Sequence, residues 1–354
     1  MGETQTKQFC ICNSASAPKR RTNKLSLSSS PESCSKAALI HPKKQKKVIK
    51  YSFERDFKLL KKIGEGSYGS IYLVLHNQSN QQYAVKQINK NIKLKNTEHA
   101  LKENIFKEKK ILKNISHPFI IKLHFTFQDE DSLYLVMDYM NGGDLSTVIH
   151  NEKFLNEDTV KFYLAEVYLA IKYLHSKNII HRDIKSENIL LDSNGHIKLI
   201  DFGLAKKGID HCNLTSSFIG TAECIPPEVL LHQSYGFNFD WWSFGILMYE
   251  MIYGFPPFRD FYQGGIFHLI LNTEPLYYKL HPGSTNRKKI KVSNEAIDLM
   301  KALLNKNPEM RINPDEIPKH PFFCDVDFDK ISKQEVEVPY LPIEREYERD
   351  DLKL

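Results

Sequence analysis

Three glycines fall within six residues, at Gly64, Gly66 and Gly69, between two segments with strand-like composition, 57–63 and 70–75. Without side chains, such a backbone can close over a phosphate chain that any Cβ would obstruct. The same spacing occurs in dinucleotide-binding turns, but there the glycines open a helix. Here the chain continues as a strand. The sequence therefore predicts a phosphate-covering β-hairpin and not a Rossmann turn.

The composition argues against membrane-spanning, secreted and cysteine-rich metal-binding classes of protein. The 354 residues, 41% of them apolar, suffice for a large core, but no apolar run approaches the roughly 18–20 residues of a membrane span. The N-terminus lacks the apolar stretch of a signal peptide, and the six cysteines lack metal-ligand spacing. We therefore expect a cytoplasmic protein with reduced thiols, with nuclear access left open and membrane contact at most peripheral.

The charge is concentrated at the N-terminal end. Residues 1–50 hold eleven Lys and Arg against two acidic residues, whereas the remaining chain carries 38 basic and 41 acidic residues. The body of the protein is therefore not expected to bind nucleic acid specifically. The Ser-rich arm has no apolar period and is predicted to be disordered. Met1-Gly2 fits a loose myristoylation pattern that Glu3 disfavours, so lipidation, a regulatory role and plain disorder stay open for the arm.

Apolar periodicity divides the remaining chain into two lobes. Strands and one helix are expected in the first, with strands at 57–63, 70–75, 82–88, 121–127 and 133–138 and the helix over 96–113. Gly142-Gly143 breaks the pattern and separates a small lobe, 57–140, from a larger one, 141–323. Helices are expected there over 156–176, 241–252 and 293–304. This order predicts an α+β fold with a ligand cleft between its lobes, followed by a short tail, 324–354.

Two polar groups of the small lobe fit phosphate binding. Lys86 ends the apolar strand segment Tyr83-Ala84-Val85 and is a plausible ligand for phosphates if a carboxylate holds it. Glu108, on the expected helix, is suited to that role. Taken alone, a glutamate on a helix is more often an ordinary solvated residue.

Two motifs of the larger lobe carry the chemistry. In the segment His181 to Asn188, Asp183 can accept or orient a proton from an attacking hydroxyl. Asn188 and Asp201 offer hard oxygen ligands suited to Mg²⁺ on nucleotide phosphates. Asp201 opens the triplet Asp-Phe-Gly, and Pro226-Pro227-Glu228 follows it.

This ordered set of motifs resembles the eukaryotic protein kinases over residues 57–323. The resemblance implies a bilobal fold, ATP and Mg²⁺ as cofactors, protein substrates with Ser or Thr acceptors, and a signalling role. It implies catalytic functions for Asp183, Lys86, Glu108 and Lys185, the last typical of Ser/Thr-specific kinases. It implies these nucleotide contacts: Ile63, Gly64, Glu65, Gly66, Ser67, Tyr68, Gly69, Ser70, Ile71, Ala84, Lys86, Met137, Asp138, Met140 and Leu190.

The same resemblance implies structural roles and shows two departures. Glu228 and Arg311 match a pair that fastens the activation segment, and Asp240 matches the residue that holds the catalytic loop. Ser186 stands where the family usually has proline, and Pro226 where it usually has alanine. Since neither position carries the chemistry, we expect altered rigidity and not lost activity.

Several motifs resemble the AGC group, and the tail segment Val338 to Pro342 looks like the start of an AGC C-terminal tail. The subfamily stays open between a phosphoinositide-dependent type and a ribosomal S6 or Akt-like type. The first of these would dock a hydrophobic motif from a partner in trans. A pseudokinase scaffold would lack the chemistry of Lys86, Asp183 or Asp201, and a small-molecule phosphotransferase would lack the lock of Glu228 and Arg311.

Regulation and specificity are further implications of the AGC resemblance. Ser217 aligns with the activation-loop phosphosite, to be modified by an upstream kinase or by autophosphorylation, and its phosphate could pair with Arg182. Asp144, Glu187 and Glu250 match acidic positions that receive arginines N-terminal to the acceptor. The alternative is that these three are ordinary surface acids. The resemblance thus predicts a basophilic kinase.

Overall fold

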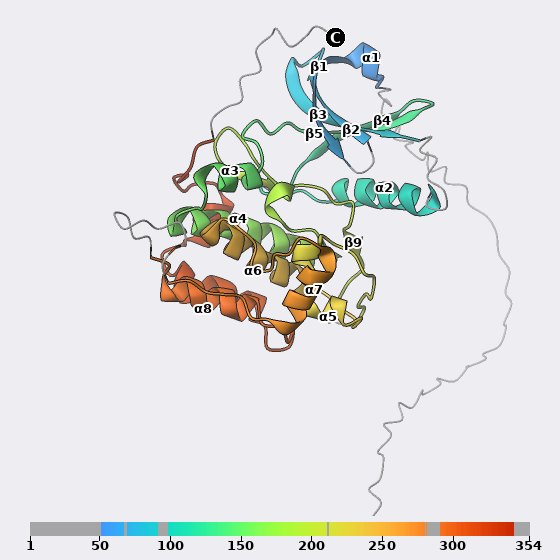
Figure 1. The fold of residues 1–354 in the computed structure, drawn as a ribbon. Helices are drawn as coiled ribbons and strands as arrows, with labels where there is room; N and C mark the ends of the chain where they lie inside the picture. The colour runs from blue at the N-terminus through green and yellow to red at the C-terminus, as the bar shows by residue number, and fades with distance from the viewer. Residues whose placement is uncertain are drawn as a thin grey trace, which may run out of the picture. The chain divides into compact units, whose positions relative to one another are not determined.

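The computed structural model describes residues 51–66, 69–90, 98–210, 212–279, 281 and 291–342. The arm 1–50, Ser67, Tyr68 and the tail end 343–354 lie outside the described residues, and so do the predictions made for them. Where described, the chain shows a sheet-rich lobe followed by a helical one (Figure 1). The predicted α+β, two-lobed architecture is confirmed.

The small lobe is one antiparallel sheet with a helix beside it. Its strands follow the order β1-β2-β3-β5-β4. The elements are β1 (Phe57–Gly66), β2 (Gly69–His76), β3 (Gln81–Asn89), α2 (Glu98–Leu112), β4 (Leu123–Gln128) and β5 (Ser132–Asp138), preceded by the single turn α1 (Phe53–Asp56). All five predicted strands and the predicted helix are present.

The fourth strand begins later than the sequence suggests. A strand was expected from residue 121, but β4 starts at Leu123. Ile120 instead forms a bridge with Leu199 of the large lobe, and the backbone N–H of Ile121 donates to the Leu199 carbonyl at 3.1 Å. These two residues therefore connect the lobes. Their backbone groups interact with the large lobe and do not pair within the small sheet.

The large lobe is built around one buried helix. Its helices are α3 (Leu145–Glu152), α4 (Glu157–Ser176), α5 (Pro227–Leu230), α6 (Asn238–Tyr253), α7 (Gln263–Asn272), α8 (Asn294–Leu303) and α9 (Phe328–Ser332). In α6 every residue is buried except Asn238 and Glu250, as its apolar composition predicts. The caps of α4 and α8 are Asn156 and Ser293, whose side chains accept from Thr159 N and Ala296 N.

Four of these helices were not predicted, namely α3, α5, α7 and α9. They span four to ten residues each, too short for a clear apolar period. Short strands and single helical turns complete the lobe: β6 (Ile179–Ile180), η1 (Ser186–Asn188), β7 (Ile189–Leu191), β8 (Ile197–Leu199), β9 (Lys206–Lys207), η2 (Ala222–Cys224), η3 (Pro314–Lys319) and η4 (Pro321–Phe323). No helix among the described residues has both the length and the apolar character to cross a bilayer.

Segments flanking the two lobes pack onto them. Before β1, the ring of Tyr51 lies 4.7 Å from that of Phe125, centroid to centroid, and the ring of Phe53 lies 5.1 Å from that of Tyr134. After α9, the tail crosses the turn at Gly195, where a Cβ would overlap the carbonyl oxygen of Tyr340. Gly195 has a φ of +83°, so both its backbone and its surroundings require glycine.

Candidate active site

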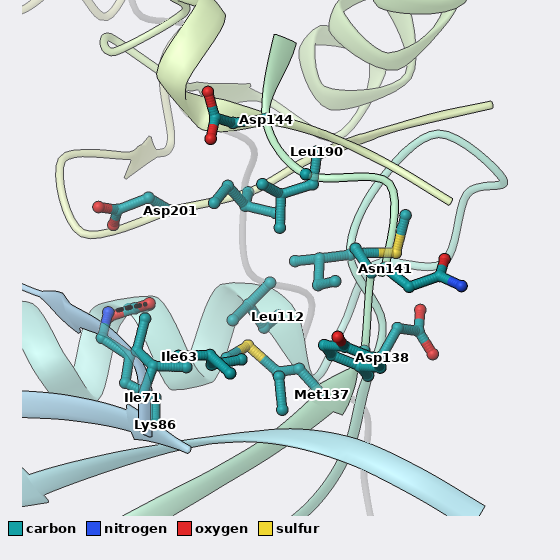
Figure 2. A pocket seen from close by; sticks show the side chains of 17 residues that line it. Ile63, Ile71, Lys86, Leu112, Met137, Asp138, Asn141, Asp144, Leu190 and Asp201 are labelled. Carbon is teal, nitrogen blue, oxygen red and sulfur yellow. Dashed lines mark hydrogen bonds and ion pairs between the residues drawn. The ribbon is translucent and has the colours of Figure 1, made fainter. Parts of the chain in front are cut away.

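A cavity of about 260 Å³ lies between the small sheet and the start of the large lobe (Figure 2). Many of the residues predicted to bind nucleotide, substrate or metal line it: Ile63, Ile71, Ala84, Lys86, Met137, Asp138, Met140, Leu190, Asp144 and Asp201. Glu108 lines it as well. Tyr139, in the hinge segment 138–140 that the resemblance implies, lines it too. Further lining residues were missed by the sequence reasoning: Leu112, Ile121, Asn141, Gly143 and Ile200. The lining is largely apolar, with Lys86, paired to Glu108, and Asp201 on one side, an arrangement that suits a planar ring joined to phosphates.

The lysine and glutamate of the small lobe form a buried ion pair. Lys86 Nζ donates to the two carboxylate oxygens of Glu108 at 2.9 and 3.1 Å, and Figure 2 shows the contact on the same side of the cavity as Asp201. Burial raises the pKa of Glu108, and the adjacent ammonium of Lys86 opposes that shift. The predicted partnership is therefore present. It fixes the lysine side chain at the cavity wall.

The glycine hairpin has the expected β-form. Gly64 pairs with Ile71, Glu65 with Ser70 and Gly66 with Gly69 across β1 and β2. At Gly69, a Cβ would collide with the carbonyl oxygen of Gln87 on β3, so the sheet itself excludes a side chain there. Of the predicted loop contacts, the glycines at 64, 66 and 69 together with Glu65 and Ser70 do not line the cavity.

Asp183 lies at the centre of a hydrogen-bonded cluster. Its Oδ1 accepts from Thr221 Oγ1 at 2.6 Å, and its Oδ2 accepts from Asn188 Nδ2 at 2.7 Å. Lys185 Nζ donates to the same threonine hydroxyl at 2.7 Å and lies 3.3 Å from Asp183 Oδ2. The structure thus brings three predicted residues together and adds Thr221. A threonine directly after a glycine, Gly220, in the segment before Pro226-Pro227-Glu228 was the signal that could have found it.

The loop that carries Asp183 is held at its start by Asp240 of α6. Its carboxylate accepts from the backbone N–H groups of His181 and Arg182 at 2.9 and 2.8 Å, and from His175 Nε2 at 2.8 Å. Burial would raise the pKa of Asp240, but these donors hold it below its usual value. The predicted holding role of this carboxylate agrees with the geometry.

Asn188 and Asp201 offer oxygen atoms that fit a magnesium ion. The amide nitrogen of Asn188 donates to Asp183, which turns its amide oxygen away from that contact. Asp201 is solvent-exposed, lines the cavity and uses Oδ1 to accept from Gly203 N at 3.0 Å. A carboxylate and an amide oxygen are hard ligands of the kind Mg²⁺ binds while retaining water. The donor set therefore suits this metal.

The activation segment is tied to the large lobe at two places. Arg182 Nη1 donates to the Ser217 hydroxyl at 3.0 Å, and Tyr235 donates to the Ser217 carbonyl at 2.7 Å. Farther along, Arg311 binds Glu228 through two nitrogens, at 2.9 and 3.0 Å, with both side chains buried. The pairing of Glu228 with Arg311 and the proximity of Ser217 to Arg182 match the predicted arrangement.

The three predicted substrate acids differ in their surroundings. Asp144 caps α3, accepting from the backbone N–H and hydroxyl of Thr147 at 2.7 and 3.0 Å. Glu187 is exposed, whereas Glu250 is half-buried and accepts from the Ser186 hydroxyl at 3.0 Å. Within the described residues, neither glutamate forms an ion pair with Lys, Arg or His. Both are therefore available for a cationic ligand.

Comparisons with known proteins agree with this geometry. The protein kinase domain family model matches residues 57–323. The chain is 42% identical to a probable serine/threonine-protein kinase of Dictyostelium discoideum, over 79% of this chain and 59% of that protein. It is 42% identical to the serine/threonine-protein kinase Sgk1 of Gallus gallus (81% and 64%) and 41% identical to ribosomal protein S6 kinase 2 alpha of the same species (81% and 37%). The chain thus spans less than two thirds of the length of these relatives.

Proposed function

This chain belongs to the protein kinase family, and on that premise we propose that it transfers the γ-phosphate of ATP to Ser or Thr hydroxyls of proteins in intracellular signalling. The observation that carries the proposal is that the Lys86–Glu108 pair and Asp201 line one cavity. Asp183 is joined to this cavity through Asn188, which donates to Asp183 and whose carbonyl accepts from the N–H of the lining residue Ile200. Lys185, a residue typical of Ser/Thr-specific kinases at this position, supports Ser or Thr as the phosphate acceptor. The names of the relatives support the same acceptor class.

Positioning accounts for most of the proposed catalysis. Lys86, held by Glu108, would bind phosphate oxygens, and Asp183, oriented by Asn188 and Thr221, would take the proton of the attacking hydroxyl. Mg²⁺, when bound through Asn188 and Asp201, would neutralise charge on the phosphates. The apolar cavity wall would hold the adenine, and the glycine hairpin would cover the phosphates.

The likeness to S6 kinase 2 alpha and Sgk1 supports the AGC group and, of the two open subfamilies, the S6 type. A hydrophobic-motif partner in trans belongs to the phosphoinositide-dependent alternative, whereas a cytoplasmic location and nuclear access are part of the proposal for either type. All three rest on the sequence pattern.

The direct test is transfer of labelled phosphate from Mg-ATP to an array of Ser/Thr peptides that vary around the acceptor. We expect incorporation into Ser and Thr peptides but not Tyr peptides, and a preference for arginine before the acceptor. No incorporation after pre-phosphorylation of Ser217 would contradict the catalytic proposal. Incorporation without any arginine preference would contradict only the proposed specificity.

Arginine recognition by Glu250 should depend on pH. Burial, the Glu187 carboxylate and the Glu223 carboxylate raise the pKa of Glu250 to about 7, while the hydrogen bond from Ser186 lowers it. Because a guanidinium binds the ionised form, the preference for arginine peptides over arginine-free peptides should increase from about pH 6 to about pH 8. The ratio of kcat/KM values for the two peptides measures it. A ratio that is flat across this range would contradict the prediction.

Phosphorylation of Ser217 should activate the enzyme. Its exposed hydroxyl already contacts Arg182, so a phosphate there would make charge-assisted hydrogen bonds that order the segment. Ser217→Ala should lower kcat/KM by roughly tenfold or more, the value of one such bond. The control is Ser216→Ala, which removes the neighbouring exposed hydroxyl. Equal activity of the two variants would show that Ser217 is not the regulatory site.

A further inference from the structure

Glu250 is an exception within its helix. It lies in the last turn of α6. In the whole helix, only Asn238 and Glu250 are not buried. A carboxylate at this end of a helix faces the negative pole of the helix dipole. The carboxylates of Glu187 and Glu223 also act on it, and burial raises its pKa. A hydrogen-bond donor would therefore favour the ionised form of Glu250 and hold its carboxylate in one orientation.

Ser186 supplies that donor from the catalytic loop. Its side chain is fully buried, and its hydroxyl lies 3.0 Å from Glu250 Oε1 and 3.4 Å from Glu187 Oε2. A hydroxyl has one proton to donate, and the shorter contact identifies Glu250 as its main acceptor. The bond joins residues 64 positions apart in the chain. Ser186 thus links the large lobe's central helix to the loop that carries Asp183.

The surroundings offer Glu250 no substitute for this bond. Cys224 is buried close by, and burial raises the pKa of its thiol, which keeps it a neutral and weak donor. Among the described residues, no lysine or arginine forms an ion pair with Glu187, Glu223 or Glu250. A hydrogen bond from Ser186 is the only one that the described part of the chain makes to the Glu250 carboxylate.

We propose that Ser186 is a positioning residue for specificity, which holds the Glu250 carboxylate so that it binds a substrate arginine before the acceptor. The proposal rests on the proposed function. With Oε1 held by Ser186, Oε2 remains for the guanidinium, and the exposed carboxylate of Glu187 lies beside it as a second acceptor. Such paired acceptors match the planar donor set of arginine better than the single ammonium of lysine. The serine at this position is thereby a specificity element and not merely a change in loop rigidity.

The test compares variants of the full chain on two peptides, one with a single arginine at the preferred position and one with alanine there. Ser186→Ala removes only the hydroxyl. Ser186→Gly is a second variant, which also removes the hydroxyl and adds no atom to this buried site. Ser132→Ala, which also removes a buried serine hydroxyl but at the first residue of β5 and outside the cavity lining, is the matched control.

Both Ser186 variants should lower the arginine preference, the ratio of kcat/KM values for the two peptides, roughly tenfold, and mainly through KM of the arginine peptide. Ser132→Ala should leave the ratio unchanged. In a Glu250→Gln background, Ser186→Ala should not lower the arginine preference further, because both changes disrupt the same hydrogen-bonded Glu250 carboxylate. This non-additivity distinguishes a positioning role from general damage to the loop.

Each other outcome has its own meaning. If the unmodified enzyme shows no arginine preference, the proposed specificity fails and the role of Ser186 fails with it. If the enzyme prefers arginine and both Ser186 variants keep that preference, only the role of Ser186 is overturned. If the variants lose activity equally on both peptides, Ser186 supports the catalytic loop as a whole and the specificity role is again overturned.

Discussion

Asp183→Asn is expected to lower kcat about 10³-fold while leaving nucleotide binding intact, because general-base catalysis contributes about 10²–10⁴-fold. The change keeps the shape of the side chain, and its carbonyl oxygen can still accept from Thr221. It removes the charge, and it turns one oxygen into an amide facing Asn188 Nδ2, where two donors would meet. Turnover under saturating Mg-ATP and peptide measures the effect.

Two controls support that interpretation. Asp129→Asn makes the same chemical change on the β4–β5 turn of the small lobe, away from the cleft, and should not change kcat. Binding of a fluorescent ATP analogue and the thermal unfolding midpoint should be similar for Asp183→Asn and the unmodified enzyme. A loss of less than tenfold in kcat would contradict the assignment of Asp183 as the base.

Arg311→Met is expected to lower the free energy of unfolding by about 3–5 kcal/mol, the cost of leaving one charge of a buried pair without its partner. The Glu228 carboxylate would then remain buried, without the two hydrogen bonds that Arg311 donates. The guanidinium also lies over the ring of Trp242, with Cζ 5.2 Å from the ring centroid, so the loss includes this cation–π contact, while methionine refills part of the space. Chemical denaturation followed by tryptophan fluorescence suits the measurement.

The matched control is an exposed ion pair of the same lobe. Lys161 and Asp325 lie 2.7 Å apart, but 56% of the Asp325 side chain is accessible, so Asp325→Asn should cost about 1 kcal/mol or less. The double replacement of Arg311 and Glu228 by Met and Leu should recover much of the stability lost by Arg311→Met alone. Equal effects of Arg311→Met and Asp325→Asn would contradict the importance of burial at the Glu228–Arg311 pair.

Local sequence patterns predicted the features that depend on interactions between residues close together in the chain. Alternating and apolar strand segments, helix caps such as Ser293, and the glycine hairpin were all visible because their geometry depends on near neighbours in the chain. The Lys86–Glu108 pair, 22 residues apart, came from the resemblance and not from spacing alone, since a single helix glutamate has no pattern of its own.

Contacts between distant segments were beyond such reasoning. Thr221 reaches Asp183 across 38 residues, and Ser186 reaches Glu250 across 64. Ile120 and Ile121 bind the large lobe, although their composition is typical of a strand in the small sheet. In each case the partner depends on how the lobes pack, which short-range periodicity does not encode.

The segments that flank the two lobes determine where an expressed fragment of this protein should begin and end. A fragment limited to 57–323, the range of the family match, would lose the rings of Tyr51 and Phe53 and leave Phe125 and Tyr134 uncovered. It would also lose the tail segment whose Tyr340 lies over Gly195. Newly bare aromatic surface favours self-association, so such a fragment would be prone to precipitate during purification. Expression boundaries at or beyond residues 51 and 342 keep both covers in place.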